Sequence, residues 1–298
     1  MSPIVIFCYK RKRHLEKLIS SLLLNQEAQE SDLIIFSDGA RDGRDINEVN
    51  EVRQYIRGIN GFKSVRINYR DSNYGLSLSI ISGITELFQV YSYLIVLEDD
   101  LMVSPFFLRY MNDALIKYEE EESVICIHGY RYPIFRKQQK SYMLRGADCW
   151  GWGTWRRAWP DLNVSTELLL HELAERNLGF HFNYQGGIDY VEMLEQQRDG
   201  MIDSWAIKWH AWAFLRNCFT LYPSINLVIN SGSDGSGTHK AFDSQFLDGN
   251  FSSIPVEVEI FNAAEDVEVL SEMRALFKLR NTMLNKSLKK VKSFFSFK

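Results

Sequence analysis

Short runs of apolar residues alternate with helical patterns over the first 130 residues of the chain. Apolar runs of strand length occupy residues 3–8, 33–37, 65–68, 93–97 and 124–127. Between them, apolar positions recur at the spacing of one helical face, in 14–24, 76–89 and 106–118. This alternation predicts an α/β fold whose mostly parallel sheet is covered by helices on both faces.

Polar residues follow several of these predicted strands directly. Arg11 comes after the first, Asp38 after the second, Asn73 in the loop after the third, and Glu98-Asp99-Asp100 after the fourth. Ligands of such sheets bind beyond the carboxyl ends of the strands. We therefore expect these side chains to face one crevice.

The pattern changes after residue 140. Residues 146–159 are dense in Gly and Trp, residues 203–215 resemble an aromatic-rich helix, and a Gly/Ser loop occupies 230–239. No repeat or linker interrupts the chain. We predict a single domain over 1–263, with halves 1–130 and 131–263, followed by a helical tail over 264–298.

Charge is unevenly distributed along a chain of otherwise ordinary globular composition, which is 46% hydrophobic. The net charge is −4, yet residues 274–298 contain eight basic residues and no acid, which leaves −12 on the preceding part. An acidic body argues against nucleic-acid binding, and a basic tail is typical of attraction to an anionic surface.

Cysteine usage and hydropathy predict a cytoplasmic protein. None of the four cysteines has CxxC spacing, and Cys8 and Cys126 lie in apolar runs, so we expect reduced, buried thiols. The apolar run 4–8 precedes the basic cluster 10–13, the reverse of a signal peptide. No apolar run approaches the ~20 residues of a membrane-spanning helix.

The acids Glu98, Asp99 and Asp100 are costly to bury without a partner. A divalent cation such as Mn²⁺ or Mg²⁺ is a suitable partner, because it prefers oxygen ligands and is usually held by one or two carboxylates plus substrate phosphates. The metal would neutralise a nucleoside diphosphate leaving group. The alternative is a solvated turn whose acids favour the N-terminus of the helix after Ser104-Pro105.

Three residues of the first half are candidates for binding a sugar-nucleotide donor. The Asp38 carboxylate can accept the N3–H of uracil, or it simply ends a strand in an Asp-Gly turn. Arg11 lies in the basic run 9–13 before a helix, a suitable anion site, or it is a solvated cap. Asn73 contacts the donor or caps the next helix.

The second half supplies candidates for the acceptor and the catalytic base. Trp150 and Trp152 present flat faces to a sugar, or they form an aromatic core. Asp203 precedes Trp205 and Trp209, an aromatic wall that would desolvate a base and raise its pKa. The alternative for Asp203 is a helix N-cap.

Other candidates in the second half are Asp148 and Asp234, which are further possible bases. The loop 231–239 has the small residues of a mobile lid. His239 within it is a candidate metal ligand, although a lone histidine usually is not one.

Segments 7–11, 37–38, 96–101 and 104–107 resemble the Golgi α-mannoside β-1,2-N-acetylglucosaminyltransferase. They resemble more closely the bacterial family-2-like sugar transferases of polysaccharide gene clusters. The resemblance covers roughly residues 3 to 240. It implies a GT-A fold, with a Rossmann-like nucleotide half over 1–130 and an acceptor half with a lid over 131–263. It also implies inverting transfer from a UDP-sugar with Mn²⁺, in bacterial surface polysaccharide synthesis.

Carried over residue by residue, the resemblance makes Asp100 the metal ligand and Asp203 the base. Glu98 and Asp99 would contact the sugar and ribose, and Asp38 would bind uracil with Arg11 beside it. From the residues themselves, rather than from the resemblance, we expect acceptor contacts from Trp150, Trp152 and Asp148. The chain departs from the Golgi pattern at two positions: Ser204 replaces the second acid of a Trp-flanked pair, and Lys10 replaces an acid.

The tail has the pattern of a basic amphipathic helix. Its apolar residues fall near one helical face, and its lysines lie mostly off it: Leu276, Leu279, Met283, Leu288, Val291 and Phe295 are the apolar set. Such a helix can lie at a membrane interface, here the inner face of the plasma membrane, where a lipid-linked acceptor is found. Packing on the body or on a second subunit is the alternative.

Two other functions remain open from the sequence. A metal-dependent sugar nucleotidyltransferase would need a Gly-rich phosphate loop after the first strand, but residues 9–13 contain no Gly. A non-catalytic carbohydrate-binding protein would use the aromatic residues, but it would not explain the buried acids.

Overall fold

The computed structural model describes residues 1–134, 140–159, 164–232 and 250–295, with side chains of the last helix described as far as residue 282. Within these ranges the main sheet has the strand order β3-β2-β1-β4-β8-β6-β9-β7. The strands are β1 (Ile4–Cys8), β2 (Asp32–Ser37), β3 (Ser64–Tyr69), β4 (Tyr93–Glu98), β6 (Val124–His128), β7 (Tyr142–Arg145), β8 (Trp152–Trp155) and β9 (Phe219–Tyr222).

The sheet is mixed and mostly parallel. Strands β3, β2, β1 and β4 run parallel to one another, as do β6 and β9. Strands β8 and β7 run antiparallel to their neighbours. A short second sheet pairs β5 (Leu101–Val103) with β10 (Val228–Asn230). The predicted α/β fold with a mostly parallel sheet is confirmed.

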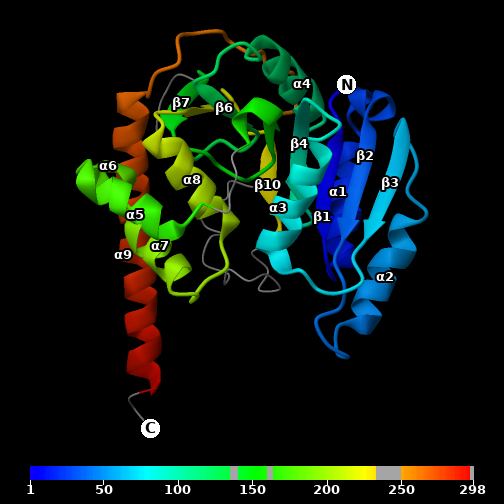
Figure 1. Ribbon diagram of the computed structural model, residues 1–298, viewed down its shortest axis with the longest axis horizontal. Helices are drawn as coiled ribbons and strands as arrows, with labels where there is room; N and C mark the ends of the chain where they lie inside the picture. The colour runs from blue at the N-terminus through cyan, green and yellow to red at the C-terminus, as the bar shows by residue number, and fades with distance from the viewer. Residues whose placement is uncertain (135–139, 160–163, 233–249, 296–298) are drawn as a thin grey trace.

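Helices lie on both faces of this sheet (Figure 1). They are α1 (Lys12–Leu22), α2 (Ile46–Ile56), α3 (Gly75–Leu87), α4 (Phe107–Lys117), α5 (Thr166–Glu175), α6 (Gly179–Phe182), α7 (Tyr190–Arg198), α8 (Trp205–Leu215) and α9 (Val267–Phe295), with 3-10 turns η1 (Gln26–Glu30) and η2 (Arg156–Ala158). Predicted elements of the first half agree with these bounds within two residues at each end. Helix α2 was not predicted, although its buried residues Val49, Val52 and Ile56 have helical spacing.

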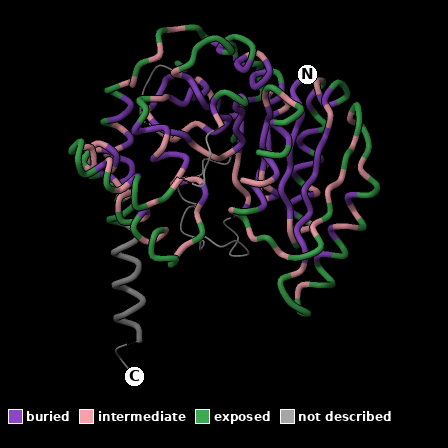
Figure 2. The backbone as a smooth tube through the Cα atoms, in the orientation of Figure 1, coloured by how far each residue is buried: buried purple, intermediate pink, exposed green. Residues whose placement is uncertain are grey.

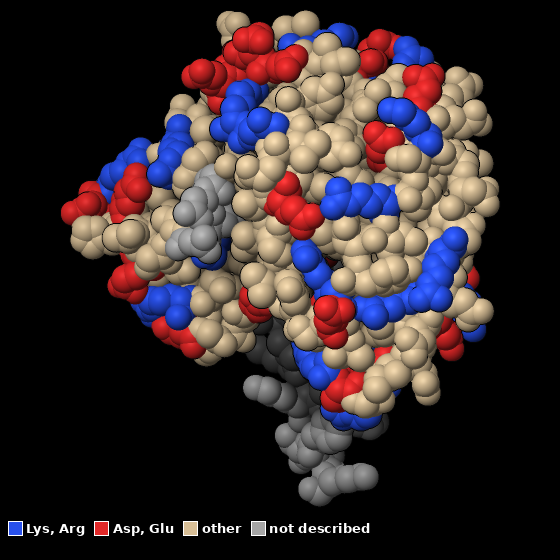
Figure 3. Space-filling view, turned by 45° about the vertical axis from the view of Figure 1, so that its right-hand side comes forward, with Lys and Arg blue, Asp and Glu red and all other residues tan. Residues whose placement is uncertain are grey.

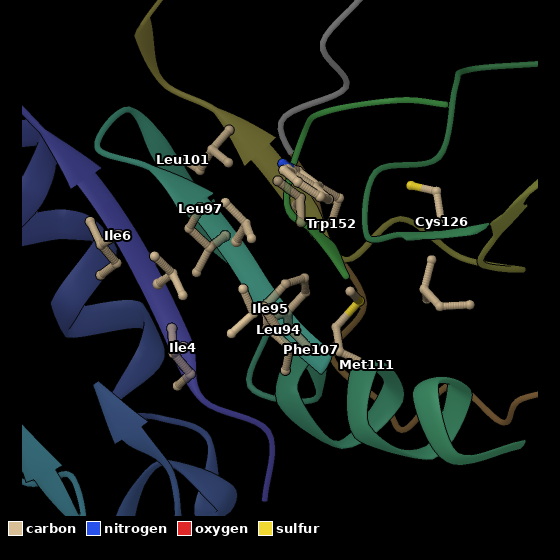
Figure 4. Close-up of a cluster of buried hydrophobic side chains, with 14 of the residues drawn as sticks. Ile4, Ile6, Leu94, Ile95, Leu97, Leu101, Phe107, Met111, Cys126 and Trp152 are labelled. Carbon is tan, nitrogen blue, oxygen red and sulfur yellow. The ribbon is translucent and has the colours of Figure 1, made fainter. Parts of the chain in front are cut away.

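The central strand β1 and residues 94–97 of β4 are apolar because both faces of these strands are covered. Buried positions run along them in Figure 2. Figure 4 shows Ile95 and Leu97 of β4 beside Phe107 and Met111 of α4. All of these side chains are fully buried. Cys8 and Cys126 are buried free thiols, as predicted.

Within the Gly/Trp-rich segment, strand β8 forms part of the core rather than a ligand-facing surface. Trp152 is 1% exposed. Its ring centroid lies 4.5 Å from Trp209, 5.4 Å from Trp205 and 5.8 Å from Trp159. The expectation that Trp152 contacts the acceptor is therefore wrong, because three other indoles enclose it.

The first turns of α9 pack on the body, and the helix then continues past it (Figure 1). Val269, Met273 and Phe277 are buried against the β7–β9 edge of the sheet and Tyr184. In the described residues, no helix combines the length and apolar character needed to cross a bilayer. Over the face drawn in Figure 3, acidic side chains lie among the basic ones.

Candidate functional site

The acidic triplet lies at the carboxyl end of β4 and is paired with Arg11. Strand β1 runs parallel to β4 in the register Phe7↔Glu98, so the residues after β1 emerge beside the triplet. The Arg11 guanidinium donates hydrogen bonds to the Asp99 carboxylate and, at 3.1 Å, to that of Asp100. Arg11 therefore contacts the acids rather than Asp38.

Burial and mutual repulsion set the protonation of these acids. Burial, together with the charges of Asp100 and Asp99, raises the pKa of Glu98 to about 8, although Arg11 acts to lower it. Burial also raises the pKa of Asp99, against the effect of Arg11. At neutral pH Glu98 is thus largely protonated, and the guanidinium balances the two aspartates in part.

The start of the Gly/Ser loop covers the triplet. The backbone N–H and the hydroxyl of Ser231 donate to the Asp100 carbonyl at 2.7 and 2.9 Å. A Cβ on Gly232 would lie 2.4 Å from Asp100 Oδ2, so a larger residue there would displace the Asp100 carboxylate. The rest of the predicted lid, with Asp234 and His239, lies outside the described residues.

Asp38 anchors the first turn of α3. Its carboxylate accepts backbone N–H groups from Gly39 at 3.0 Å, Tyr74 at 2.8 Å and Gly75 at 3.0 Å. Asn73 does not cap the helix, because Tyr74 occupies the N-cap position. The Asn73 amide instead donates to the Gly39 carbonyl at 2.9 Å. Both residues thus fix the loop before α3.

Asp203 faces the same loop from the second half of the chain. A Cβ on Gly75, whose φ is +73°, would lie 3.7 Å from Asp203 Oδ2. The expected desolvation of Asp203 is wrong, because the residue is exposed. It is not the N-cap of α8 either, since Ser204 takes that position and accepts from the Ile207 N–H at 3.5 Å.

The loop before β8 brings Asp148 and Trp150 toward the triplet. Strand β8 is antiparallel to β4 with Val96↔Trp152 in register, so the preceding residues return to the carboxyl end of β4. The Trp150 N–H donates to His128 Nε2 at 2.9 Å. Trp150 itself is half-buried.

Asp148 is held by hydrogen bonds from separate segments of the chain. Burial raises the pKa of the neighbouring Cys149 thiol, and the charges of Asp148, Glu98 and Asp100 contribute. The Asp148 carboxylate accepts the hydroxyls of Tyr132 at 2.8 Å and Tyr222 at 3.1 Å. Sequence reasoning missed these tyrosines because they come from separate segments without a motif.

A complete metal cage is not preformed in the described residues, where no three His, Cys, Asp or Glu side chains converge. Mg²⁺ and Mn²⁺ need fewer protein ligands, because substrate phosphates and water complete their coordination. The Asp100 carboxylate has one hydrogen-bonded cationic partner, at Oδ2, and is partly accessible. The donor set therefore fits a cation held jointly with a diphosphate.

Comparisons with known proteins found partial structural likeness and no sequence relative. No protein-family model and no curated protein match this chain. Solved structures of S. aureus TarS resemble it with TM-scores of 0.33 and 0.43 at 12% and 10% identity, covering 48% and 78% of this chain. TarS 1–349 in complex with UDP-GlcNAc has a TM-score of 0.32 at 14% identity and 43% coverage. The chain covers 25%, 62% and 34% of these three solved chains, respectively.

Proposed function

We propose that this chain is an inverting GT-A glycosyltransferase that transfers a hexosyl or N-acetylhexosaminyl group from a UDP-sugar. The observation that carries the proposal is the pairing of Arg11 with Asp99 and Asp100 at the carboxyl ends of two adjacent parallel strands. Open α/β sheets bind nucleotides at this edge. A guanidinium beside two carboxylates suits a metal-bound diphosphate, because the guanidinium can bind phosphate and a carboxylate can bind the metal.

The donor would lie between the acidic triplet and the first turn of α3. Asp100 would hold Mn²⁺ or Mg²⁺ together with the diphosphate, and the cation would supply charge neutralisation for the leaving UDP. Glu98 and Asp99 would contact sugar and ribose. Asp38 and Asn73 would hold the loop against uracil, with the Asp38 carboxylate using its remaining lone pair.

The catalytic base would be Asp203. Its carboxylate lies against Gly75, across from the proposed donor, and it has no hydrogen bond in the described part of the chain to compete for its lone pairs. An inverting transfer needs such a base to take the proton of the attacking hydroxyl. Asp148 is a weaker candidate, because three donors already occupy its carboxylate.

The acceptor would be a glycan or lipid-linked saccharide of a bacterial surface polysaccharide, bound near Trp150 and Asp148. The basic sequence after residue 282 would place the protein on the inner face of the plasma membrane. Removing residues 280–298 should abolish binding to vesicles that contain anionic lipid. Retained binding by the truncated protein would show that the tail does not dock.

Calorimetry with UDP, with and without Mn²⁺, tests the proposal. We expect metal-dependent UDP binding that Asp100→Ala weakens by about 100-fold, the loss of roughly one strong charged interaction. Asp113→Ala, at an exposed acid of α4, is the matched control. A carbohydrate-binding protein would bind no nucleotide, and a nucleotidyltransferase would release pyrophosphate from a nucleoside triphosphate. UDP binding that depends on neither Mn²⁺ nor Asp100 would contradict the assignment.

A further inference from the structure

A cluster of tyrosines surrounds Asp148 at the edge of the sheet. Tyr132 and Tyr222 donate their hydroxyls to one carboxylate oxygen, at 2.8 and 3.1 Å. The Cys149 N–H donates to the other oxygen at 2.8 Å. These bonds fix the carboxylate and the two phenol rings relative to the loop that leads to the acidic triplet.

Tyr184 and Tyr190 extend this cluster without using their hydroxyls. Their ring centroids lie 5.8 Å apart, and each ring packs against His210, at 6.2 and 5.1 Å. Neither hydroxyl forms a hydrogen bond within the described part of the chain, and neither is a fully buried atom without a partner. Tyr190 is half-buried, so the cluster reaches the surface there.

His210 lies behind these two rings in the interior of the protein. Its Nδ1 donates to the Ala147 carbonyl at 2.8 Å, and burial lowers the pKa of the ring, so Nε2 is unprotonated. The residue is 7% exposed, and its buried Nε2 has no hydrogen-bond partner in the part of the chain that the structure describes. Such a group is uncommon in a folded protein, because burying an unpaired acceptor is costly.

Helix α9 forms one wall of the cluster. The Phe277 ring centroid lies 5.2 Å from Tyr184 and 6.1 Å from Tyr132, in edge contacts with both. The Asn281 side chain donates to the Gly187 carbonyl at 3.1 Å, which ties the helix to the segment before Tyr190. The tyrosines are thus enclosed between the sheet edge and α9.

We propose that this cluster binds a sugar unit of the acceptor, with the hydroxyls of Tyr184 and Tyr190 as its hydrogen-bonding groups. A pyranose offers oxygen acceptors and hydroxyl donors for the two phenols, and a C–H face for the rings. Ligand sites commonly combine aromatic walls with a few such polar groups. The inference rests on the proposed glycosyltransferase function.

Saturation-transfer NMR with the full chain tests the inference. The probes are methyl glycosides of hexoses and N-acetylhexosamines, in the presence of UDP and Mn²⁺. We expect at least one glycoside to bind, and Tyr190→Phe and Tyr184→Phe each to weaken it about tenfold. The control is Tyr110→Phe, which removes a buried, unpartnered hydroxyl from α4 and should change nothing.

The outcomes separate this inference from the proposed function. Equal glycoside affinity in all four proteins overturns the site, as does the absence of glycoside binding when UDP still binds. Loss of glycoside binding in the two cluster variants with unchanged UDP affinity supports it. If glycoside binding depends on the cluster but the chain binds no UDP, the sugar site is supported and the proposed transferase function is contradicted.

Discussion

The protein stabilises the carboxylates of the acidic triplet and that of Asp148 in different ways. Asp99, 3% exposed, depends on a guanidinium, whereas Asp148 depends on neutral hydroxyls and one backbone N–H. The carboxylates of the triplet, which pair with a charged group, can also interact with other ions, such as a metal or a diphosphate. The Asp148 cluster is held by neutral hydrogen bonds, so it keeps its geometry and can offer hydrogen bonds to a neutral ligand. The triplet is therefore suited to charged ligands and the Asp148 cluster to sugar hydroxyls.

The largest effect is expected at Asp203, which belongs neither to the acidic triplet nor to the cluster around Asp148. Asp203→Asn should lower the rate of sugar transfer by about 10² to 10⁴, the usual contribution of a general base, and leave UDP affinity unchanged. Steady-state kinetics and calorimetry measure the two quantities. Asp199→Asn, at a nearby exposed acid, is the control. Full transfer activity in a folded Asp203→Asn protein would move the base to another residue, with Asp148 the first to test.

Removing the charged partner should destabilise the protein strongly. Arg11→Gln leaves Asp99 buried without its ion pair, and we expect the free energy of unfolding to fall by about 3 kcal/mol. Urea denaturation measures it, and Arg13→Gln, on the exposed face of α1, serves as the comparison. A change below about 1 kcal/mol would mean that Asp99 does not depend on Arg11.

Glu98 gives the acidic triplet a pH dependence. Its pKa is about 8 in the folded chain against 4.5 for an ordinary glutamate, so the folded protein binds the proton more tightly. Stability should therefore fall as pH rises from about 4.5 to about 8. Glu98→Gln should remove this loss and stabilise the protein at pH 8, with little effect at pH 4.5. Thermal unfolding at the two pH values measures the difference; equal gains at both would contradict it.

The smallest effect should come from a neutral partner. Tyr132→Phe removes one of three hydrogen bonds to Asp148, and we expect a loss of about 1 kcal/mol. The same urea titration measures it beside Arg11→Gln. If the tyrosine variant lost as much stability as the arginine variant, the distinction between charged and neutral stabilisation would not hold.

The first half of the chain was predictable because each strand carries its own signal. The apolar runs of β1 and β4 are local, and parallel strands bring their following residues to one edge, so the crevice of Arg11 and the triplet follows from pattern alone. The partner of Arg11 did not follow, because sequence cannot tell which of several neighbouring acids a long side chain reaches.

The second half depends on contacts between distant segments. Trp150 and Trp152 have similar neighbours in the sequence. In the structure, however, β8 directs the Trp152 side chain into a cluster of indoles and leaves Trp150 half-buried. Asp203 was expected against the indoles of Trp205 and Trp209, but these point into the core and leave it in solvent. The tyrosines around Asp148 come from four separate segments, so no spacing could indicate them.

The antiparallel strand β8 gives this architecture an unusual sensitivity to chain length. Trp152 packs on the indoles, whereas Trp155 donates its indole N–H to the Leu115 carbonyl of α4. Successive strand residues face opposite sides of a sheet. A single-residue deletion between Asp148 and Trp152 would therefore exchange these two faces along the strand. The packing of β8 on both faces therefore constrains the length of the loop that precedes it.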